Sequence, residues 1–214
     1  MKGRVNVNLT SIIESLKKER QVFHSEADFQ FALAWQIQRA YPDAKVRLEY
    51  CPAQKPNMHI DIVVTLNNKT ICIELKYKTL KLNLESDGET YNLKGHGAED
   101  IGKYLFLKDL QRIEMLCDSS SIFSYGYVVF LTNDPTYWKP KRINKETAAE
   151  AFRLHDGAQL HGNLDWGLNT GEGTKRGHEE PIELVGDYDV NWKNYSVVSN
   201  GRNGTFKYLE FKFE

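Results

Sequence analysis

Two carboxylates and a lysine stand close together in one apolar stretch of the sequence. Asp61, Glu74 and Lys76 all lie between Ile60 and Lys78, among isoleucine, valine and leucine residues. Carboxylate oxygens are the ligands that Mg²⁺ prefers, and a nearby lysine can orient a water molecule or help to deprotonate it. Its positive charge also suits the transition state of a phosphate ester. These residue types predict the hydrolysis of phosphodiester bonds.

The predicted fold of this stretch brings the three side chains together. The two asparagines at 67–68 predict a tight hairpin turn, because asparagine tolerates the positive φ that such turns require. The register of this hairpin sets Asp61 directly opposite Glu74, and a symmetric lengthening of the loop would keep that pairing. Strand alternation then places Cys72, Glu74 and Lys76 on one face of the hairpin.

A solvated sheet face with a simple lysine–glutamate pair is the structural alternative, since charged residues mostly lie at the surface. Two opposed carboxylates repel when their Cβ atoms are about 5 Å apart, so a sheet built only for stability would avoid them. The surrounding strands are also apolar enough to be buried. Charged groups in such a place favour a functional site.

The elements that must position these residues follow from periodicity and from turn signals. We predict helices over 9–20, capped by Thr10 or Ser11, and over 25–41, with Ser25 and Asp28 forming a capping box. The remaining predictions are strands at 46–50, 60–66 and 70–78, a loop at 80–97, a helix at 98–117, a strand at 125–131, a helix at 148–154, a long surface excursion at 157–180, and strands at 182–185 and 206–213.

The motif Asp61, then Glu74-Leu75-Lys76 on the next strand, resembles the PD-(D/E)xK nuclease superfamily of restriction and repair enzymes. The order helix, three strands, helix, strand over about 22–134 is that of the superfamily core. Ile60 stands where the nominal proline would be. The resemblance implies an α/β, restriction-endonuclease-like fold (αβββαβ), in which a central mixed β-sheet is flanked by helices.

The resemblance also implies roles for individual residues. Asp61 and Glu74 would bind Mg²⁺, for which Mn²⁺ would substitute, and Lys76 would act on the attacking water. Many members carry a glutamate on the first core helix that approaches the metal, and Glu26 occupies that place, so the resemblance implies that Glu26 assists catalysis as a further metal ligand. An acidic residue in the first turn of a helix is also stabilised by the helix dipole alone, so Glu26 has a purely structural alternative.

Candidate contacts to phosphate lie just beyond the third strand and on the second core helix, which flanks the cleft in the superfamily. Arg112 has an alternative role, because Asp109 three residues earlier can pair with it at the surface. The candidates for nucleic-acid binding are Lys78, Lys81, Lys103, Lys108 and Arg112.

Composition predicts one domain over residues 1–214, with 135–214 as a C-terminal elaboration that ends in a long loop and strands. The 214 residues are 41% hydrophobic, which is enough for a sizeable core. The formal net charge is -1, so contacts to nucleic acid must be local. No stretch has the run of about 20 apolar residues that a membrane span needs, and no signal peptide is recognised, so a cytoplasmic location is expected.

The cysteines and histidines offer weaker signals. Cys51, Cys72 and Cys117 are far apart in sequence, which favours buried thiols over disulfides or zinc ligands. The histidines in the glycine-rich segment 155–180 match no standard zinc spacing, so we expect a loop without bound zinc there.

The sequence therefore predicts a Mg²⁺-dependent endonuclease acting on DNA in restriction, phage defence or repair. One alternative is a catalytically inactive nucleic-acid-binding or assembly module with the same fold. Another is a nuclease acting on RNA or on branched or single-stranded DNA, because the chemistry is the same. No membrane partner is expected, and the resemblance admits a homodimer because enzymes that cut duplexes are often dimers.

Overall fold

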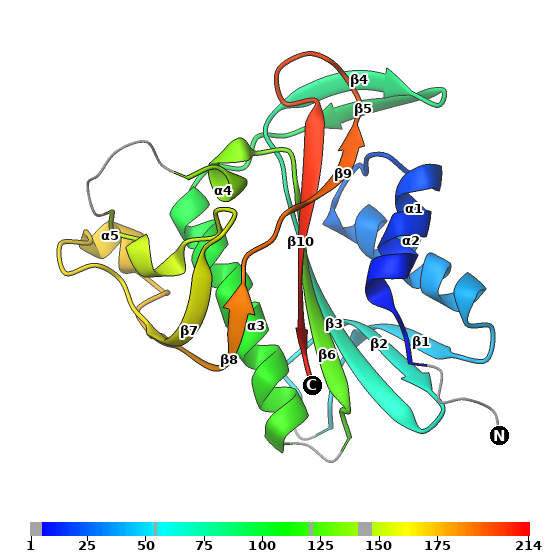
Figure 1. Cartoon of the computed structure of the whole chain (residues 1–214), viewed down its shortest axis with the longest axis horizontal. Coiled ribbons are helices and arrows are strands. Elements are labelled where there is room, and N and C mark those ends of the chain that lie inside the picture. Colours follow the sequence, from blue (N-terminus) through cyan, green and yellow to red (C-terminus); the bar gives the residue numbers. More distant parts are fainter. Residues whose placement is uncertain (1–5, 54, 120–121, 141–146) are drawn as a thin grey trace.

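A mixed six-stranded sheet is the centre of the molecule (Figure 1). The computed structural model describes residues 6–53, 55–119, 122–140 and 147–214. Only the pair β3/β6 is parallel, and the other neighbours in this sheet are antiparallel. In spatial order the strands are β1 (Lys45–Tyr50), β2 (Ile60–Leu66), β3 (Lys69–Lys78), β6 (Tyr125–Thr132), β10 (Thr205–Phe213) and β9 (Lys193–Val197).

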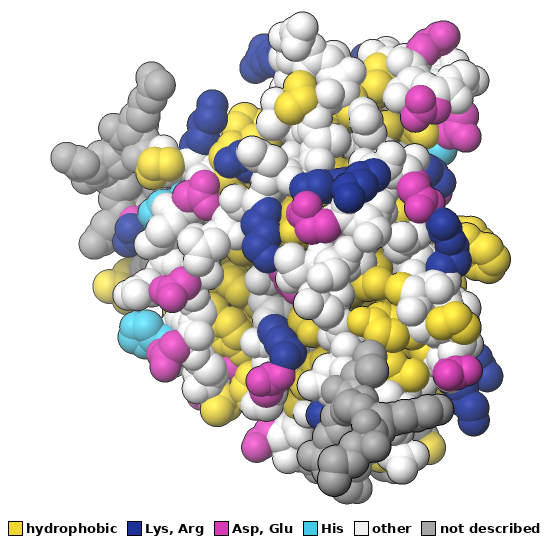
Figure 2. Space-filling model, turned by 45° about the vertical axis from the view of Figure 1, so that its right-hand side comes forward, with side chains coloured by type: hydrophobic (Ala, Val, Ile, Leu, Met, Phe, Trp, Pro, Cys, Tyr) yellow, Lys and Arg dark blue, Asp and Glu magenta, His cyan; other side chains and the backbone are white. Residues whose placement is uncertain are grey.

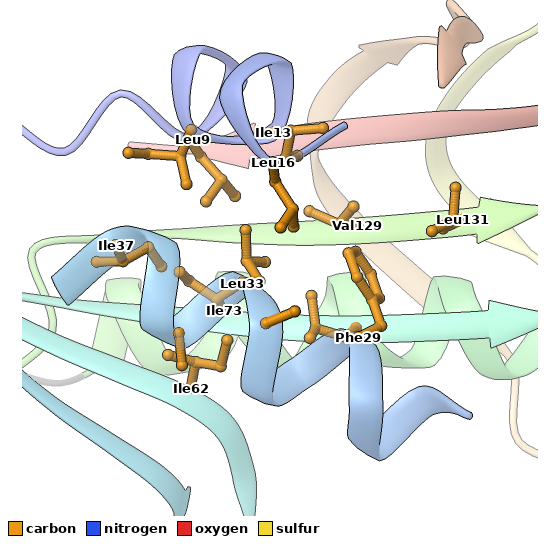
Figure 3. Close-up of a cluster of buried hydrophobic side chains, with 14 of the residues drawn as sticks. Leu9, Ile13, Leu16, Phe29, Leu33, Ile37, Ile62, Ile73, Val129 and Leu131 are labelled. Atoms are coloured by element: carbon orange, nitrogen blue, oxygen red, sulfur yellow. The ribbon is translucent and has the colours of Figure 1, made fainter. Parts of the chain in front are cut away.

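Helices cover both faces of this sheet and form two hydrophobic cores. One face packs against α1 (Leu9–Glu19) and α2 (Glu26–Ala40), and Figure 3 shows their leucine, isoleucine and phenylalanine side chains meeting those of the strands. The other face packs against α3 (Glu99–Ser119). Strand β6 is buried along its whole length between these layers, as its continuous apolar run predicts. The predicted mixed α/β architecture with flanking helices is confirmed.

The hairpin β2–β3 has the predicted turn and register. Asn67 and Asn68 both have positive φ, of 51° and 62°, as a tight hairpin turn requires. Leu66 pairs with Lys69, and the ladder continues in that register to the pair Ile62 and Ile73. The isoleucines of β3 enter the core under α1 and α2, whereas Cys72 on the opposite face enters the core under α3.

The starts of the first two helices agree only in part with the predictions. Ser25 caps α2, since its hydroxyl accepts a hydrogen bond from the Asp28 N–H at 3.1 Å. The Asp28 carboxylate returns to the N–H of His24, one residue before the cap. The cap of α1 is Asn8, whose side chain accepts from the Ser11 N–H, so the prediction of Thr10 or Ser11 was wrong. An asparagine serves as well as serine or threonine at this position.

The predicted loop at 80–97 contains a second hairpin, formed by β4 (Leu82–Ser86) and β5 (Glu89–Leu93). Asp87 and Gly88 supply its turn with positive φ. Tyr91 and Leu93 are buried in the core under α1 and α2, which explains how so polar a segment forms strands. The prediction of a loop was wrong here, because a polar, glycine-containing segment can still form a hairpin when alternate residues of one strand are buried.

The C-terminal region is more ordered, and more central, than predicted. The expected helix at 148–154 is a single 3₁₀ turn, η1 (Glu150–Phe152), preceded by α4 (Pro135–Trp138). The expected surface excursion contains the strand β7 (Gln159–Leu164) and the short helix α5 (Glu172–Lys175). Strand β7 pairs with β8 (Ile182–Asp189).

The region after residue 134 also completes the central sheet. Strand β10 pairs with β6, and β9, which the sequence patterns missed, pairs with β10. These two strands therefore belong to the central sheet. Among the described helices, none is long and apolar enough to cross a membrane.

Glu114 on α3 holds the hairpin β7–β8 against the helix. Its carboxylate is almost fully buried and accepts hydrogen bonds from the N–H groups of Val185 and Gly186 and from the hydroxyl of Tyr188, at 3.0, 2.8 and 2.7 Å. Three donors thus balance the desolvation of one charge.

Replacing Glu114 by alanine should leave these three donors without a partner in a dry interface. We expect Glu114→Ala to lower the free energy of unfolding by on the order of 3 kcal/mol, as urea denaturation would measure. Glu183→Ala, at an exposed position of β8, is the matched control and should change stability by about 0.5 kcal/mol or less. Equal effects of the two substitutions would show that the Glu114 contacts do not hold the hairpin.

Candidate active site

The part of β3 that extends past β2 forms the base of the site. The ladder between β2 and β3 ends at Ile62 and Ile73, while β3 continues and pairs on its other side with β6 as far as Lys78. The N–H groups of Leu75 and Tyr77 therefore have no strand partner on the β2 side. Both find a carboxylate instead, because buried N–H groups require an acceptor.

Asp61 and Glu26 supply those carboxylates. Asp61 Oδ2 accepts from the Leu75 N–H, and Glu26 Oε2 from the Tyr77 N–H, each at 2.6 Å. Asp61 is the second residue of β2, and Glu26 is the first residue of α2. The backbone of one strand thus places two acidic side chains side by side along its edge.

Glu74 lies next to Asp61 and is more deeply buried. Its side chain is only 2% exposed, and its Oε2 atom binds the guanidinium of Arg112. Burial raises the pKa of Glu74 well above its usual range; Arg112 opposes this rise, and the charges of Asp61 and Asp109 add to it. Among the described residues, Glu74 Oε1 is buried without a hydrogen-bond partner.

Arg112 and Asp109 reach the site from α3. Arg112 Nη2 lies 2.7 Å from Glu74 Oε2 and 3.0 Å from Asp109 Oδ1. The Asp109 carboxylate also lies 2.9 Å from Lys76 Nζ. The prediction of a surface pair was therefore half right: Asp109 and Arg112 do pair, but they face β3 in a largely buried position. The three-residue spacing alone cannot tell which face of the helix is covered.

Lys76 is held among acidic groups. Burial lowers the pKa of its ammonium group, but the nearby charges of Asp109, Glu26 and Asp61 more than offset this effect and leave the pKa raised. Lys76 therefore carries a proton in the structure as it stands, and it is placed to act as a cation and hydrogen-bond donor.

Gln30 is a further buried polar residue that the sequence patterns did not single out. Its amide donates to the backbone carbonyl of Asp61 at 2.8 Å and to the side chain of Glu49 at 2.7 Å. It lies one helical turn after Glu26 on α2, so the four-residue spacing on that helix was the available signal. Gln30 thereby fixes the backbone at the start of β2, which carries the Asp61 side chain.

Two hollows open beside this group of residues. One, of about 580 Å³, runs along α3 and is lined by Asp109 and Arg112 together with Met58 and Lys108. The second, of about 330 Å³, is lined by residues around the start of α2 and the end of β3. Its lining comprises His24, Ser25, Glu26, Tyr77, Lys78, Thr79, Asn92, Lys94 and His96.

The predicted phosphate contacts are not equally well placed. Lys78 and Lys108 each line one of the hollows, and Arg112 lines the larger one while it binds Glu74. Lys81 is exposed at the surface but lines neither. Lys103 is wrongly placed for a phosphate contact, because its side chain is only 7% exposed and lies near Glu99, Asp100 and the ring of Tyr137.

The burial of Asp61 predicts a dependence of stability on pH in metal-free protein. Burial raises the pKa of Asp61 from 3.8 to about 6, so the folded chain binds more protons than the unfolded chain between these values. The contribution of Asp61 to stability therefore falls as pH rises through this window. Asparagine has no carboxyl to titrate, so Asp61→Asn removes this loss of stability. We expect the free energy of unfolding of Asp61→Asn to rise relative to that of the parent by on the order of 2–3 kcal/mol across the window.

Urea denaturation in EDTA across the same pH range measures this gain. Asp43→Asn, at an exposed position, is the matched control and should follow the pH profile of the parent. A constant difference between Asp61→Asn and the parent at every pH would contradict the burial of an ionisable carboxyl at this position.

Comparisons with known proteins identified no relative of this chain. The chain matches no protein-family model, and searches against curated proteins and against solved structures found no match. Among the described residues, no group of three or more histidine, cysteine, aspartate or glutamate side chains is already arranged around a metal position.

Proposed function

We propose that this chain is a metal-dependent nuclease that hydrolyses phosphodiester bonds in DNA, in restriction, phage defence or repair. The observation that carries the proposal is the buried carboxyl of Glu74 together with the half-buried carboxyl of Asp61, whose charge adds to the rise in the pKa of Glu74 that burial causes, beside Lys76. The order α2, β1, β2, β3, α3, β6 also supports it, because this is the order of the PD-(D/E)xK core, here with the hairpin β4–β5 inserted before α3.

The charges of the site fit a divalent cation. The four carboxyls of Glu26, Asp61, Glu74 and Asp109 interact with the two cations Lys76 and Arg112, which leaves an excess of two negative charges in this group when all are ionised. The buried Glu74 Oε1 also lacks a donor among the described residues.

Asp61 and Glu74 would hold Mg²⁺ or Mn²⁺, with Glu26 close by. Mg²⁺ needs only one or two protein carboxylates and takes its other ligands from water and phosphate. When bound, the cation supplies polarisation of the phosphate and a more acidic water.

The protein side chains would position and stabilise the reacting groups. The N–H groups of β3 fix one oxygen each of Asp61 and Glu26, so these carboxylates are in place before a substrate arrives. Lys76, on the same strand, can donate to the attacking water or to a phosphate oxygen once it is released from Asp109. Its charge would offset the negative charge that grows on the phosphate.

The nucleic acid would make local contacts in the two hollows. Lys108 lines one hollow and Lys78 lines the other, so each could contact a phosphate of the bound strand. Figure 2 shows basic and acidic side chains interspersed over the face in view, without a broad field of one sign, which agrees with the formal net charge of -1. Binding through a few phosphates would make the affinity moderately salt-dependent.

One observation favours a second candidate, a module of the same fold that binds nucleic acid or a protein partner without cutting. The pairs between Glu74 and Arg112 and between Lys76 and Asp109 compensate part of the charge of the site internally. A chain that had lost cleavage could keep such pairs for stability. Separate measurements of metal binding and of cleavage distinguish the two functions.

We expect the purified protein to cleave nucleic acid with Mg²⁺ or Mn²⁺ and not with EDTA. Plasmid, single-stranded DNA, branched DNA and RNA should be offered in parallel. Asp61→Asn should abolish both metal binding and cleavage. Lys76→Ala should keep most of the metal affinity and lower the single-turnover rate roughly 10² to 10⁴-fold, as is typical for the loss of a group that assists proton transfer.

Lys18→Ala, at an exposed position of α1, is the matched control and should cleave at the parental rate. Circular dichroism of each variant checks that the fold is retained. If the parent binds the metal but cleaves none of the four substrates, the non-cutting module becomes the better assignment. If Lys76→Ala cleaves as fast as the parent, Lys76 has no part in the reaction.

The pair between Arg112 and Glu74 makes a separate prediction. A cation at Glu74 must compete with the Arg112 guanidinium, because both bind the same carboxylate. We expect Arg112→Gln to bind Mn²⁺ roughly tenfold more tightly than the parent, equivalent to about 1.4 kcal/mol, in titration calorimetry. Lys108→Gln, one turn earlier on α3 and paired with Glu180, should leave the affinity unchanged. Weaker binding by Arg112→Gln would mean that Arg112 orients Glu74 for the metal.

A further inference from the structure

Two of the three cysteines lie against each other beside the site. The Sγ atoms of Cys72 and Cys117 are 3.8 Å apart, although the residues are 45 positions apart in the chain. Cys72 on β3 is fully buried, and Cys117 in the last turn of α3 is half-buried. Cys51 is exposed and makes its contacts with Lys55 and Pro56. The prediction of buried thiols is thus right for Cys72, whereas Cys51 is exposed and Cys117 is half-buried.

Gly126 makes room for this pair. It lies opposite Cys72 in the parallel ladder between β3 and β6. A Cβ atom at this position would lie 2.4 Å from Ile113 Cγ2 and 2.9 Å from Cys72 Sγ, closer than packed atoms can stand. The glycine therefore lets α3 approach the sheet and leaves space for the buried thiol that faces Cys117.

We propose that Cys72 and Cys117 form a reversible intramolecular disulfide, and that the pair is an oxidation site for hydroperoxides. The sulfur atoms need to approach by about 1.8 Å to reach the length of a disulfide bond. A rotation of the two side chains, together with a small shift in the last turn of α3, can provide this movement. No other pair of cysteine thiols within hydrogen-bonding distance occurs in the described part of the chain.

The different exposure of the two thiols gives each a role. The hydrogen bond from the Cys72 thiol lowers the pKa of Cys117, the thiol that solvent can reach. The Cys117 thiolate attacks one oxygen of the peroxide, the O–O bond breaks, and one water (or an alcohol) leaves as Cys117 becomes a sulfenic acid. The Cys72 sulfur then attacks Cys117 Sγ, the S–O bond of the sulfenic acid breaks, and its hydroxide leaves as water with the proton of the Cys72 thiol. Two thiols lose two electrons, and the hydroperoxide gains them.

The disulfide would join the two elements that carry the site. Cys72 lies two residues before Glu74 on β3, and Cys117 lies five residues after Arg112 on α3. The bond would therefore limit the movement of α3 relative to β3, across which the pair of Arg112 and Glu74 is made. This inference does not depend on the proposed nuclease activity, because the pair and its oxidation are independent of a substrate.

Mass spectrometry of the full-length chain tests the proposal. The protein is treated with hydrogen peroxide, quenched with an alkylating agent and digested without reduction. We expect a peptide linking Cys72 to Cys117, a loss of two hydrogen atoms from the intact mass, and full reversal by dithiothreitol. Cys51→Ser should form the same link, whereas Cys117→Ser, at a half-buried position that should tolerate the change, should not.

Urea denaturation of the oxidised Cys51→Ser protein gives a second reading. A cross-link over 45 residues restricts the unfolded chain, so the denaturation midpoint should rise on oxidation and return on reduction. Oxidation of Cys117 to a sulfinic acid without a link, a link that involves Cys51, or complete alkylation of Cys72 after peroxide treatment would each overturn the proposal.

Discussion

The buried carboxyl of Glu74 is the constraint on which the rest of the site depends. It lies on a strand in the middle of the sheet, where an ionised group has lost its water and must be compensated by other groups of the protein or by a bound ion. Arg112 supplies one compensation from α3 and thereby ties that helix to β3. Asp109 then serves both Arg112 and Lys76, so the interface between helix and sheet is organised by charge as well as by apolar packing.

The same constraint explains why the site lies where the ladder between β2 and β3 stops. Had β2 continued beside β3, carbonyl groups would occupy the N–H groups of Leu75 and Tyr77, and no acidic side chain would be needed there. Because the ladder between β2 and β3 stops at Ile62 and Ile73, these donors are free for Asp61 and Glu26, and the edge of β3 is open beside the two hollows. The geometry therefore combines fixed acidic groups with access for a substrate.

Side chains of the protein occupy the positions at which the proposed metal ion and phosphate would bind. Arg112 takes the place at Glu74 that a cation would use, and Asp109 holds the Lys76 ammonium that a phosphate would attract. The disulfide that we propose between Cys72 and Cys117 would add a covalent link across the same helix and strand. Each of these contacts stabilises the resting protein. The pairs made by Arg112 and by Lys76 must open before a cation and a phosphate can take their places.

The sequence by itself determined the features that depend on neighbouring residues. These are the asparagine turn, the hairpin register and the serine cap of α2, because turn geometry and alternation act over a few positions. Tertiary structure alone decided which face of α3 is covered, and so placed Asp109 and Arg112 inside the site. It also decided that β9 and β10 complete the sheet and that the two cysteines meet, because contacts between distant segments follow from the packing of whole elements, which local patterns do not encode.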